Sequence, residues 1–315
     1  MEKRKLGNSV LEIEPLIFGG NVFGWTADEP TSFKLLDAFV EAGFNCIDTA
    51  NSYSSWVPGN KGGESETIIG NWLKRRGGRD QIVIATKVGA KLGDNSGLGK
   101  DYIRQEVEAS LKRLQTDYID LYQSHYNDPE TPIEETLEAY AKLIQEGKVR
   151  AIGASNFSAE RLEQALQASE QNNLPRYESF QPEYNLYDRE DYEKEIEPIC
   201  TRYGLGVINY YALASGFLTG KYRSEADLGQ SPRGQGVKSY LNERGFRILE
   251  ALDEVADQYR TTPASVSLAW LMARPSITAP IASATKTAQL EDLLKAASLK
   301  LDQAAIKKLD EASSY

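Results

Sequence analysis

The sequence contains a single histidine, His125, among its 315 residues. Protein zinc and iron centres commonly combine several imidazole or thiolate ligands. One imidazole cannot build a multi-histidine site, so we expect no metal. Cysteine is almost as scarce, because Cys46 and Cys200 are the only two and form no CxxC pair. Both have apolar neighbours, and we expect buried, reduced thiols, as in a reducing compartment.

An excess of positive charge and long apolar runs are also missing. The chain has 36 Lys and Arg against 46 Asp and Glu, which gives a formal net charge of −10. Nucleic acid is therefore not an expected partner, since phosphate backbones bind basic surfaces. No apolar run approaches the ~20 residues of a membrane span, and no apolar segment follows the basic N-terminal residues. We expect a cytoplasmic protein that does not enter a membrane.

The glycine patterns of the common nucleotide-binding loops do not occur. Three glycine pairs have the GxG spacing, at residues 97/99, 204/206 and 234/236, but none has the third glycine of GxGxxG. No GxxxxGK[ST] pattern occurs either. A Rossmann or P-loop mode of binding is therefore unsupported.

What the chain does have is a regular alternation of strand-like and helix-like segments. Eight short runs rich in β-branched and aromatic residues lie near 16–18, 44–48, 82–86, 119–123, 149–153, 179–181, 206–210 and 277–281. Eight such units in about this length predict a closed (β/α)8 TIM barrel, with an open doubly wound sheet as the alternative. No linker divides the chain, so we expect one domain over residues 1–315, beginning with a short β-hairpin in residues 1–14.

The helix-like segments carry apolar stripes and end signals. One face of residues 101–114 is apolar. Thr131, followed by a proline and by Glu134, predicts a capping box, and Ser158 and Thr262 are expected to cap two later helices. Long loops over residues 51–62, 88–99 and 212–240 each follow a predicted strand. In a barrel, such loops form the rim that holds the active site.

Polar residues follow three neighbouring predicted strands at this rim. Asp48 and Tyr53 follow the second strand, Lys87 the third and His125 the fourth. Each alone has an ordinary structural explanation, but the barrel would bring all four into one pocket. Lys87 would then lower the pKa of Tyr53 below its usual ~10, while Asp48 holds the ammonium. Tyr53 could donate a proton, and a neutral His125 could orient a carbonyl group.

These residues, in this order, resemble the aldo-keto reductase superfamily. Its DxxxxY segment matches residues 48–53, and its catalytic Lys and His match Lys87 and His125. Residues 63–66, 153–157 and 214–222, together with Gln181, extend the resemblance over essentially the whole chain. The likeness is greatest to the bacterial long-loop branch, which also resembles potassium-channel β subunits. It implies reversible reduction of a carbonyl compound, with Asp48, Tyr53, Lys87 and His125 as catalytic residues.

The resemblance also implies a nicotinamide cofactor, NADP(H) in preference to NAD(H). Ser155, Asn156 and Gln181 would hold the nicotinamide amide, with Tyr210 stacked on its ring. The loop carrying Lys221 would cover the pyrophosphate, and the turn and helix after the last strand, with Lys286, would receive the adenosine 2′-phosphate. The full expected cofactor set is Gly20, Asn21, Asp48, Ser155, Asn156, Gln181, Tyr210, Ala212, Leu213, Ser215, Gly216, Leu218, Lys221, Ser283, Thr285, Lys286 and Gln289.

The substrate is expected to be a small carbonyl compound or alcohol that meets aromatic residues on the rim loops. The candidate substrate contacts are Phe23, Trp25, Trp56, Tyr126, Asn127 and Tyr211. No exposed apolar stripe indicates an oligomer interface. Two other functions stay open: a cofactor-binding regulatory subunit with vestigial catalysis, and a barrel glycosidase using Asp48 and Glu183, which leaves Tyr53 and Lys87 without a role.

Overall fold

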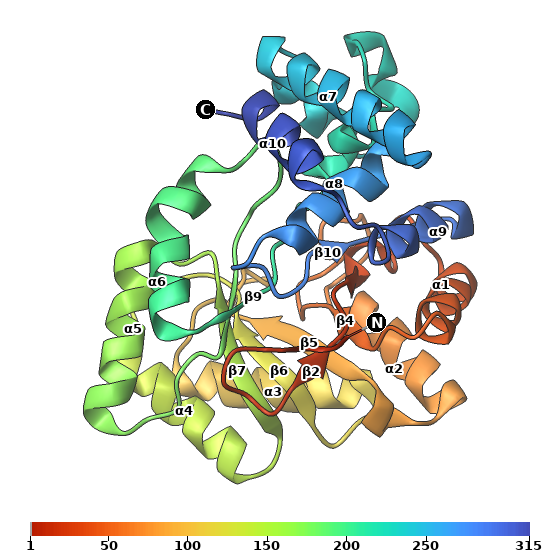
Figure 1. Ribbon diagram of the computed structural model, residues 1–315. Coiled ribbons are helices and arrows are strands. Elements are labelled where there is room, and N and C mark those ends of the chain that lie inside the picture. The colour runs from red at the N-terminus through yellow and green to blue at the C-terminus, as the bar shows by residue number, and fades with distance from the viewer. Residues whose placement is uncertain (1) are drawn as a thin grey trace.

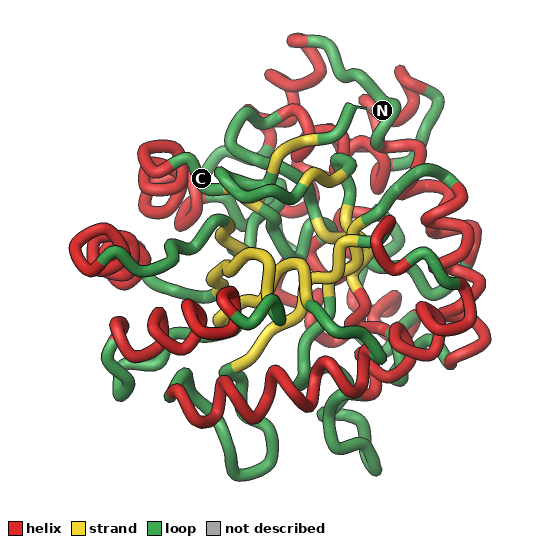
Figure 2. The backbone as a smooth tube through the Cα atoms, turned by 90° about the horizontal axis from the view of Figure 1, so that it is seen from below, coloured by secondary structure: helices red, strands yellow, loops and turns green. Residues whose placement is uncertain are grey.

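Eight short parallel strands form the centre of the molecule in the computed structural model, which describes residues 2–315 (Figure 1). Viewed from below, the strands lie in the middle and the helices surround them (Figure 2). The strands are β3 (Ile17–Gly19), β4 (Cys46–Asp48), β5 (Val83–Val88), β6 (Ile119–Ser124), β7 (Val149–Ser155), β8 (Ser179–Gln181), β9 (Gly206–Val207) and β10 (Ile281–Ala282).

The strand order is β10-β3-β4-β5-β6-β7-β8-β9, and every neighbouring pair is parallel. The two ends of this order meet, because Val207 of β9 forms a parallel bridge with Ile277 and the Ile281 N–H donates to the Asn209 carbonyl at 2.9 Å. The sheet therefore closes into a (β/α)8 barrel, as predicted, and the open sheet is excluded. The eighth strand begins later than predicted, since Pro280 has no N–H to donate within the run from residue 277.

Helices on the outside connect the strands. They are α1 (Glu29–Glu41), α2 (Glu64–Arg76), α3 (Lys100–Leu114), α4 (Ile133–Gln145), α5 (Ala159–Asn172), α6 (Glu197–Tyr203), α7 (Glu243–Tyr259), α8 (Pro263–Ala273), α9 (Thr287–Ala296) and α10 (Gln303–Ala312). Short turns of helix are η1 (Gly20–Val22), η2 (Arg79–Gln81), η3 (Tyr192–Ile196), η4 (Ala214–Thr219), η5 (Glu225–Gln230) and η6 (Gly234–Tyr240). Within residues 2–315, no helix combines the length and apolar character needed to cross a membrane.

The N-terminal hairpin closes one end of the barrel. Strands β1 (Arg4–Lys5) and β2 (Glu12–Ile13) pair antiparallel, which confirms the predicted hairpin. Leu6, Leu11 and Ile13 are buried and pack against the side chains that fill the barrel interior. Cys46 belongs to this interior cluster, and both cysteines are free and buried, as expected.

Most of the predicted helix ends are correct. The Ser158 and Thr262 side chains accept hydrogen bonds from the first turns of α5 and α8. The predicted capping box at Thr131 is wrong, because α4 begins at Ile133 after a proline cap without a side-chain hydrogen bond. The Thr131 hydroxyl instead donates to Asp128 at 2.6 Å, where the acceptor is a charged carboxylate.

The two-residue period of the strands places polar side chains inside the barrel at its C-terminal end. Ala85 and Leu121 belong to the interior cluster. Lys87 and Gln123, two positions further along β5 and β6, therefore also point inward. Gly153 pairs with Gln123 on the next strand. A Cβ atom at Gly153 would lie 2.3 Å from the Ser179 hydroxyl and 3.2 Å from Gln123 Cγ, so this glycine makes room for the glutamine.

Candidate active site

Lys87 bonds two of the other three predicted catalytic residues, Asp48 and Tyr53, and the backbone next to Asp48. Its Nζ atom donates to Asp48 Oδ2 at 2.7 Å, to the Thr49 carbonyl at 2.8 Å and to Tyr53 Oη at 2.8 Å. An ammonium has three hydrogens, so this geometry uses all of them. The Lys87 side chain is fully buried, whereas Tyr53 is half-buried. Tyr53 is thus the one member of the group that is partly exposed.

The second oxygen of Asp48 faces the middle of the barrel. Gln181 Nε2 donates to Asp48 Oδ1 at 2.9 Å, and Gln123 Nε2 lies 3.5 Å from the same atom. Gln181 Nε2 also lies 3.3 Å from Gln123 Oε1. Asp48 is therefore held on one side by a cation and on the other by two buried amides.

Tyr53 departs from the predicted electrostatics. Burial and the adjacent Asp48 carboxylate raise the pKa of Tyr53 well above its ordinary value, where we expected Lys87 to lower it. The reason is that the Lys87 charge is balanced by Asp48 at 2.7 Å, so the pair presents little net charge to the phenol. The phenol consequently keeps its proton throughout the physiological pH range. Its hydrogen points toward Asp48 Oδ2, 3.2 Å away, in the absence of a better acceptor.

His125 lies beside this group. The imidazole ring stacks on the Tyr126 ring, with the two centroids 4.8 Å apart. Its centroid is 6.0 Å from that of the Tyr53 ring. Burial, followed by the positive charge of Lys87, lowers the pKa of His125 well below its usual value, so the imidazole is neutral near pH 7. Nδ1 is buried and has no hydrogen-bond partner within residues 2–315. The ring is therefore free to act as a neutral donor or acceptor toward a molecule in the pocket.

The residues expected to hold the nicotinamide form one hydrogen-bonded chain that leads to Asp48. Tyr210 Oη donates to Asn156 Oδ1 at 2.7 Å, and Asn156 Nδ2 lies 3.1 Å from Ser155 Oγ. Ser155 Oγ donates to the Gln181 carbonyl at 2.8 Å. Gln181 then bonds Asp48, as described above. The structure thus brings the expected cofactor residues at and after the ends of β7, β8 and β9 next to Asp48, Tyr53 and Lys87.

Backbone conformation also distinguishes this rim. Eight residues other than glycine have positive φ in the described chain. Gln115, Asn173 and Arg260 are ordinary helix ends. The other five are at the rim: Ser54, Asn156, Tyr211, Ala214 and Ser215. Left-handed conformations of such residues cost free energy and concentrate at functional sites. Their grouping here is independent support for a functional rim.

The long loop after β9 carries the residues expected at the cofactor pyrophosphate. Tyr211 is exposed and Ala212, Leu218 and the side chain of Phe217 are buried, so the loop is anchored to the core. Ser215 and Gly216 both have positive φ, 56° and 95°, which turns the backbone within η4. The Lys221 ammonium lies over the Tyr222 ring at 4.9 Å, close to Gly216.

A second cation from this loop, Arg233, was not predicted. Its guanidinium lies 5.2 Å from the Trp25 ring centroid, and its buried Nη2 has no hydrogen-bond partner within residues 2–315. Burial lowers the pKa of Arg233, although a guanidinium stays charged in proteins. An unpaired, partly buried cation beside the rim fits an anionic ligand. The sequence offered only an arginine between glycines and serines in a long loop, which is no specific signal.

The residues expected around the 2′-phosphate converge from β10 and η1. Ser283 Oγ donates at 2.7 Å to Oδ1 of Asn21, the residue that follows Gly20. The Thr285 N–H and hydroxyl both lie near Gln289 Oε1, at 2.9 and 3.1 Å. Lys286 is exposed at the N-cap of α9. The N–H groups at the start of this helix are available for an anion.

Most of the predicted aromatic contacts surround Tyr53. The Trp25 and Trp56 rings are 5.6 Å apart, and Trp56 is 6.2 Å from Tyr53. Trp56, Tyr126 and Tyr211 are each about half exposed, at 49%, 49% and 47%. These four aromatic residues, Trp25, Trp56, Tyr126 and Tyr211, are referred to below as the aromatic rim.

Two expected substrate contacts lie elsewhere. Phe23, the residue that follows η1, is fully buried in the core, where it stacks on Phe18. Asn127 accepts a hydrogen bond from Arg161 Nε at 2.9 Å, which fixes the loop after β6. Gln123, by contrast, belongs to the site but was not predicted, since a glutamine within a strand gives no signal until the strand's neighbours are known.

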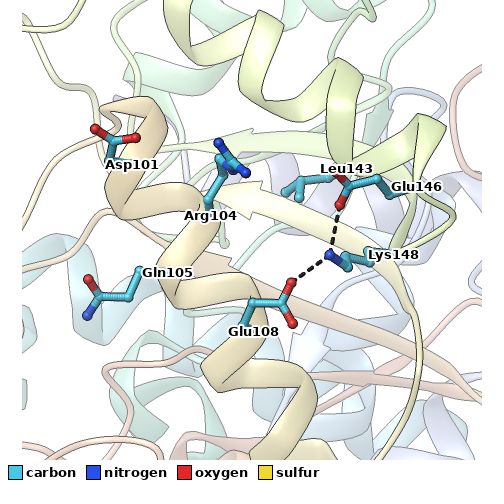
Figure 3. Close-up of a pocket in the computed structure, with 7 residues that line it drawn as sticks. All are labelled: Asp101, Arg104, Gln105, Glu108, Leu143, Glu146 and Lys148. Carbon is cyan, nitrogen blue, oxygen red and sulfur yellow. Dashed lines mark hydrogen bonds and ion pairs between the residues drawn. The ribbon is translucent and has the colours of Figure 1, made fainter.

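Two other hollows do not combine the chemical groups of this site. One of about 320 Å³ lies between α3 and α4, and its Lys148 pairs with Glu108 and Glu146 at 2.6 and 2.8 Å (Figure 3). Another of about 450 Å³ shares Asn156 and Tyr210 with the site and contains Glu183, but not Asp48, Tyr53, Lys87 or His125. Burial and the nearby Asp188 and Asp191 raise the pKa of Glu183 to about 7. Asp48 does not line that hollow, which removes support from the glycosidase alternative.

Comparison with known proteins agrees with this geometry. A model described as Aldo/keto reductase family matches residues 15–314. The oxidoreductase YrpG of Bacillus subtilis (strain 168) is 35% identical, over 99% of this chain and 95% of its own. A putative voltage-gated potassium channel subunit beta of Schizosaccharomyces pombe is 32% identical, over 99% and 93%. Norsolorinic acid reductase of Aspergillus flavus is 31% identical, over 97% and 79%. The chain therefore belongs to the aldo/keto reductase family and is an oxidoreductase.

Proposed function

We propose that the protein is an NADP(H)-dependent oxidoreductase that reversibly reduces an aldehyde or ketone to an alcohol, with Tyr53 as the proton donor. One observation carries this proposal. The Lys87 ammonium donates to both Asp48 and Tyr53 Oη, at 2.7 and 2.8 Å, and of these three residues only Tyr53 is partly exposed. Residues 1–315 would form one domain, in line with the continuous barrel.

The chain's own groups can carry the proton through reduction. Tyr53 Oη accepts a hydrogen from Lys87, so its own hydrogen is available to the oxygen of a bound carbonyl. The raised pKa of Tyr53 keeps that proton in place until reaction. As the oxygen takes the proton, the Lys87 ammonium stabilises the phenolate that forms. Neutral His125 would orient the carbonyl oxygen toward Tyr53.

The residues at the rim fit a dinucleotide. Lys221 and Arg233 provide two cations on one loop, and the unpartnered Arg233 Nη2 is a donor that a pyrophosphate oxygen would satisfy. Ser155, Asn156, Gln181 and Tyr210 would hold the nicotinamide. The remaining members of the expected set would line the path to the adenosine. When bound, the reduced cofactor supplies the hydride that the carbonyl carbon receives.

The preference for NADP(H) is supported by the segment after β10. Ser283 bonds Asn21, Thr285 bonds Gln289 in the first turn of α9, and Lys286 is exposed at the N-cap of this helix. A 2′-phosphate there would meet helix N–H groups and a cation. Members of this family use nicotinamide cofactors, and this segment is the reason to favour the phosphorylated form.

The aromatic rim supports a small carbonyl substrate with an apolar or ring-shaped body. Its exposed faces lie around Tyr53, and aromatic side chains bind such surfaces well. The test is to incubate the purified protein with a panel of aldehydes, ketones and sugars and either NADPH or NADH. We expect the absorbance of reduced nicotinamide to fall with NADPH, and more slowly with NADH. No loss with any carbonyl compound would contradict the proposal.

A second candidate function follows from the relatives named as potassium channel β subunits. The protein would then bind the cofactor as a regulatory subunit with vestigial catalysis. Tight binding of NADPH, measured by calorimetry, together with no turnover of any carbonyl compound, would favour this function over the reductase.

A further inference from the structure

A cluster of buried charges lies outside the barrel, between α2, α3 and β5. Glu66 of α2 is 0% exposed, and its Oε2 accepts a hydrogen bond from Arg113 Nε of α3 at 2.6 Å. Arg113 Nη2 lies 3.6 Å from Glu106 Oε2, and Glu106 is also buried. We call Glu66, Arg113 and Glu106 the acidic cluster, because two carboxylates and one guanidinium leave a net charge of −1.

The acidic cluster bonds two segments next to Lys87: its own strand, β5, and the loop that carries Tyr53. Thr86 precedes Lys87 on β5, and its hydroxyl donates to Glu66 Oε1 at 2.6 Å. Asn51, in the loop that carries Tyr53, donates from Nδ2 to Glu106 Oε2 at 2.8 Å. The Asn51 N–H also donates to the Lys87 carbonyl, at 3.2 Å. The strand of Lys87 and the loop of Tyr53 are therefore tied to the same group of charges.

Burying such a cluster costs free energy of desolvation. Removing carboxylates and a guanidinium from water costs several kcal/mol per ion, and well-packed apolar residues would often be as stable. One oxygen of each carboxylate accepts a hydrogen bond from a residue next to the site, Glu66 Oε1 from Thr86 and Glu106 Oε2 from Asn51. The cost of the cluster is understandable if its position and charge serve the group at Lys87.

The negative charge of Glu66 interacts electrostatically with the Lys87 ammonium. Two ionisable groups contact the ammonium, Asp48 of β4 and Tyr53 of the following loop. Two others interact with its charge without bonding it, His125 at the end of β6 and Glu66 of α2. Burial lowers the pKa of Lys87, while Asp48 and then Glu66 raise it. Tyr122 of β6 also faces the cluster, and burial raises its pKa, so it stays neutral.

We propose that the acidic cluster is a positioning and charge-balancing group for Lys87: it fixes β5 and the Tyr53 loop relative to each other and places a buried negative charge behind the strand that carries the ammonium. This inference rests on the proposed function, in which the ammonium stabilises the ionised Tyr53. Glu66, Arg113 and Glu106 touch neither substrate nor cofactor and act through Lys87.

Glu66→Gln removes the negative charge and keeps the shape of the side chain. The single amide oxygen can accept from Thr86 or from Arg113 but not from both. Removing the negative charge makes the Lys87 pKa fall further, so the ammonium is lost at lower pH. The direct readout is the titration of Lys87 in the cofactor-free protein labelled with carbon-13 at lysine Cε, with the signal assigned by its absence in Lys87→Met. We expect the titration in Glu66→Gln to move to lower pH, and the alkaline limb of kcat to move with it.

The matched control is Asp120→Asn. Asp120 is equally buried and pairs with Arg79 and Arg150 at 2.7 and 3.0 Å, but its partners do not include Lys87. This variant should lose stability without moving the Lys87 titration. Equal titrations in Glu66→Gln and the wild type would overturn the charge role. Because the titration needs no turnover, it also gives an answer if the proposed reductase activity fails.

Thr86→Val tests the positioning role separately and stands in if Glu66→Gln does not fold. Valine keeps the branched shape on the strand but cannot donate to Glu66. We expect kcat to fall by about tenfold, the size of one lost hydrogen bond to a charged group. KM for the cofactor should be unchanged, and the Lys87 titration should stay near that of the wild type. A wild-type kcat in Thr86→Val would overturn the positioning role.

Discussion

Lys87 Nζ lies 2.8 Å from Tyr53 Oη, and the other two ammonium hydrogens bind Asp48 and the Thr49 carbonyl. Because no hydrogen of the ammonium remains for another molecule, Lys87 acts only through Tyr53 and Asp48. We call Asp48, Tyr53 and Lys87 the triad; the Tyr53 hydrogen is the single acidic hydrogen of the triad that would be left for a substrate. This relationship determines what each substitution in the site should do.

Asp48→Asn should impair both stability and catalysis. The substitution leaves the Lys87 ammonium buried beside a neutral amide, and breaking a buried pair in this way costs about 3–5 kcal/mol. The free energy of unfolding should fall by that order, and kcat should fall by at least about 100-fold, as for other lost electrostatic contacts in active sites. Denaturant unfolding and initial rates measure the two effects.

Asp120→Asn again provides the control for Asp48→Asn. Asp120 pairs with Arg79 as Asp48 pairs with Lys87, and both carboxylates are buried. Removing the Asp120 charge should therefore also lower the free energy of unfolding. The kcat of this variant should stay within about twofold of the wild type, since Asp120 is not part of the Tyr53 group. A large loss of kcat in Asp120→Asn would show that destabilisation alone explains the effect of Asp48→Asn.

His125 should make stability depend on pH in one direction. Its folded-state pKa is depressed by burial and by Lys87, so between that value and the unfolded pKa of about 6.5 only the unfolded chain binds the proton. The stability associated with neutral His125 is present above about pH 6.5 and decreases by about 1.4 kcal/mol per pH unit below it. His125→Gln, which removes the only histidine, should abolish this component. Parallel stability curves for the two proteins in urea would contradict the account.

The cations of the rim should divide into two groups. Lys221→Met and Arg233→Met should weaken binding of NADPH and NADH alike, by about 10- to 100-fold, because both cofactors carry the pyrophosphate. Lys286→Met should weaken NADPH alone. Calorimetric titration of both cofactors into the three variants measures these affinities. Selective loss of NADPH in Lys221→Met, or equal losses in Lys286→Met, would mean that the two phosphate positions are assigned wrongly.

The sequence was sufficient to predict the features that depend on the spacing of apolar residues and on the order of strands and helices along the chain. Strand-like runs alternating with amphipathic segments predicted the barrel, and the residues that follow consecutive strands were brought together as parallel geometry requires. Asp48, Lys87 and His125 needed no more than their place at strand ends. Tyr53 needed only a loop short enough to turn back over the same pocket.

Features that depend on packing could not be predicted in this way. The direction of the Tyr53 pKa follows from burial and from the balance between Lys87 and Asp48, neither of which the sequence contains. Phe23 and Trp25 are both aromatic residues in the same loop, yet one is buried in the core and the other faces Arg233. Gln123 reaches its partners only because Gly153, on the next strand, has no side chain.

The most direct test of the account is Tyr53→Phe. The variant lacks the one hydrogen that the triad can donate and keeps the ring that fills the pocket. With a carbonyl compound that the wild type reduces, the rate of NADPH oxidation should fall by about 1,000-fold, the upper end of the range for loss of one preorganised donor. The affinity for NADPH, measured by calorimetry, should stay within about threefold of the wild type. Turnover near the wild-type rate would contradict the role of Tyr53, and with it the proposed mechanism.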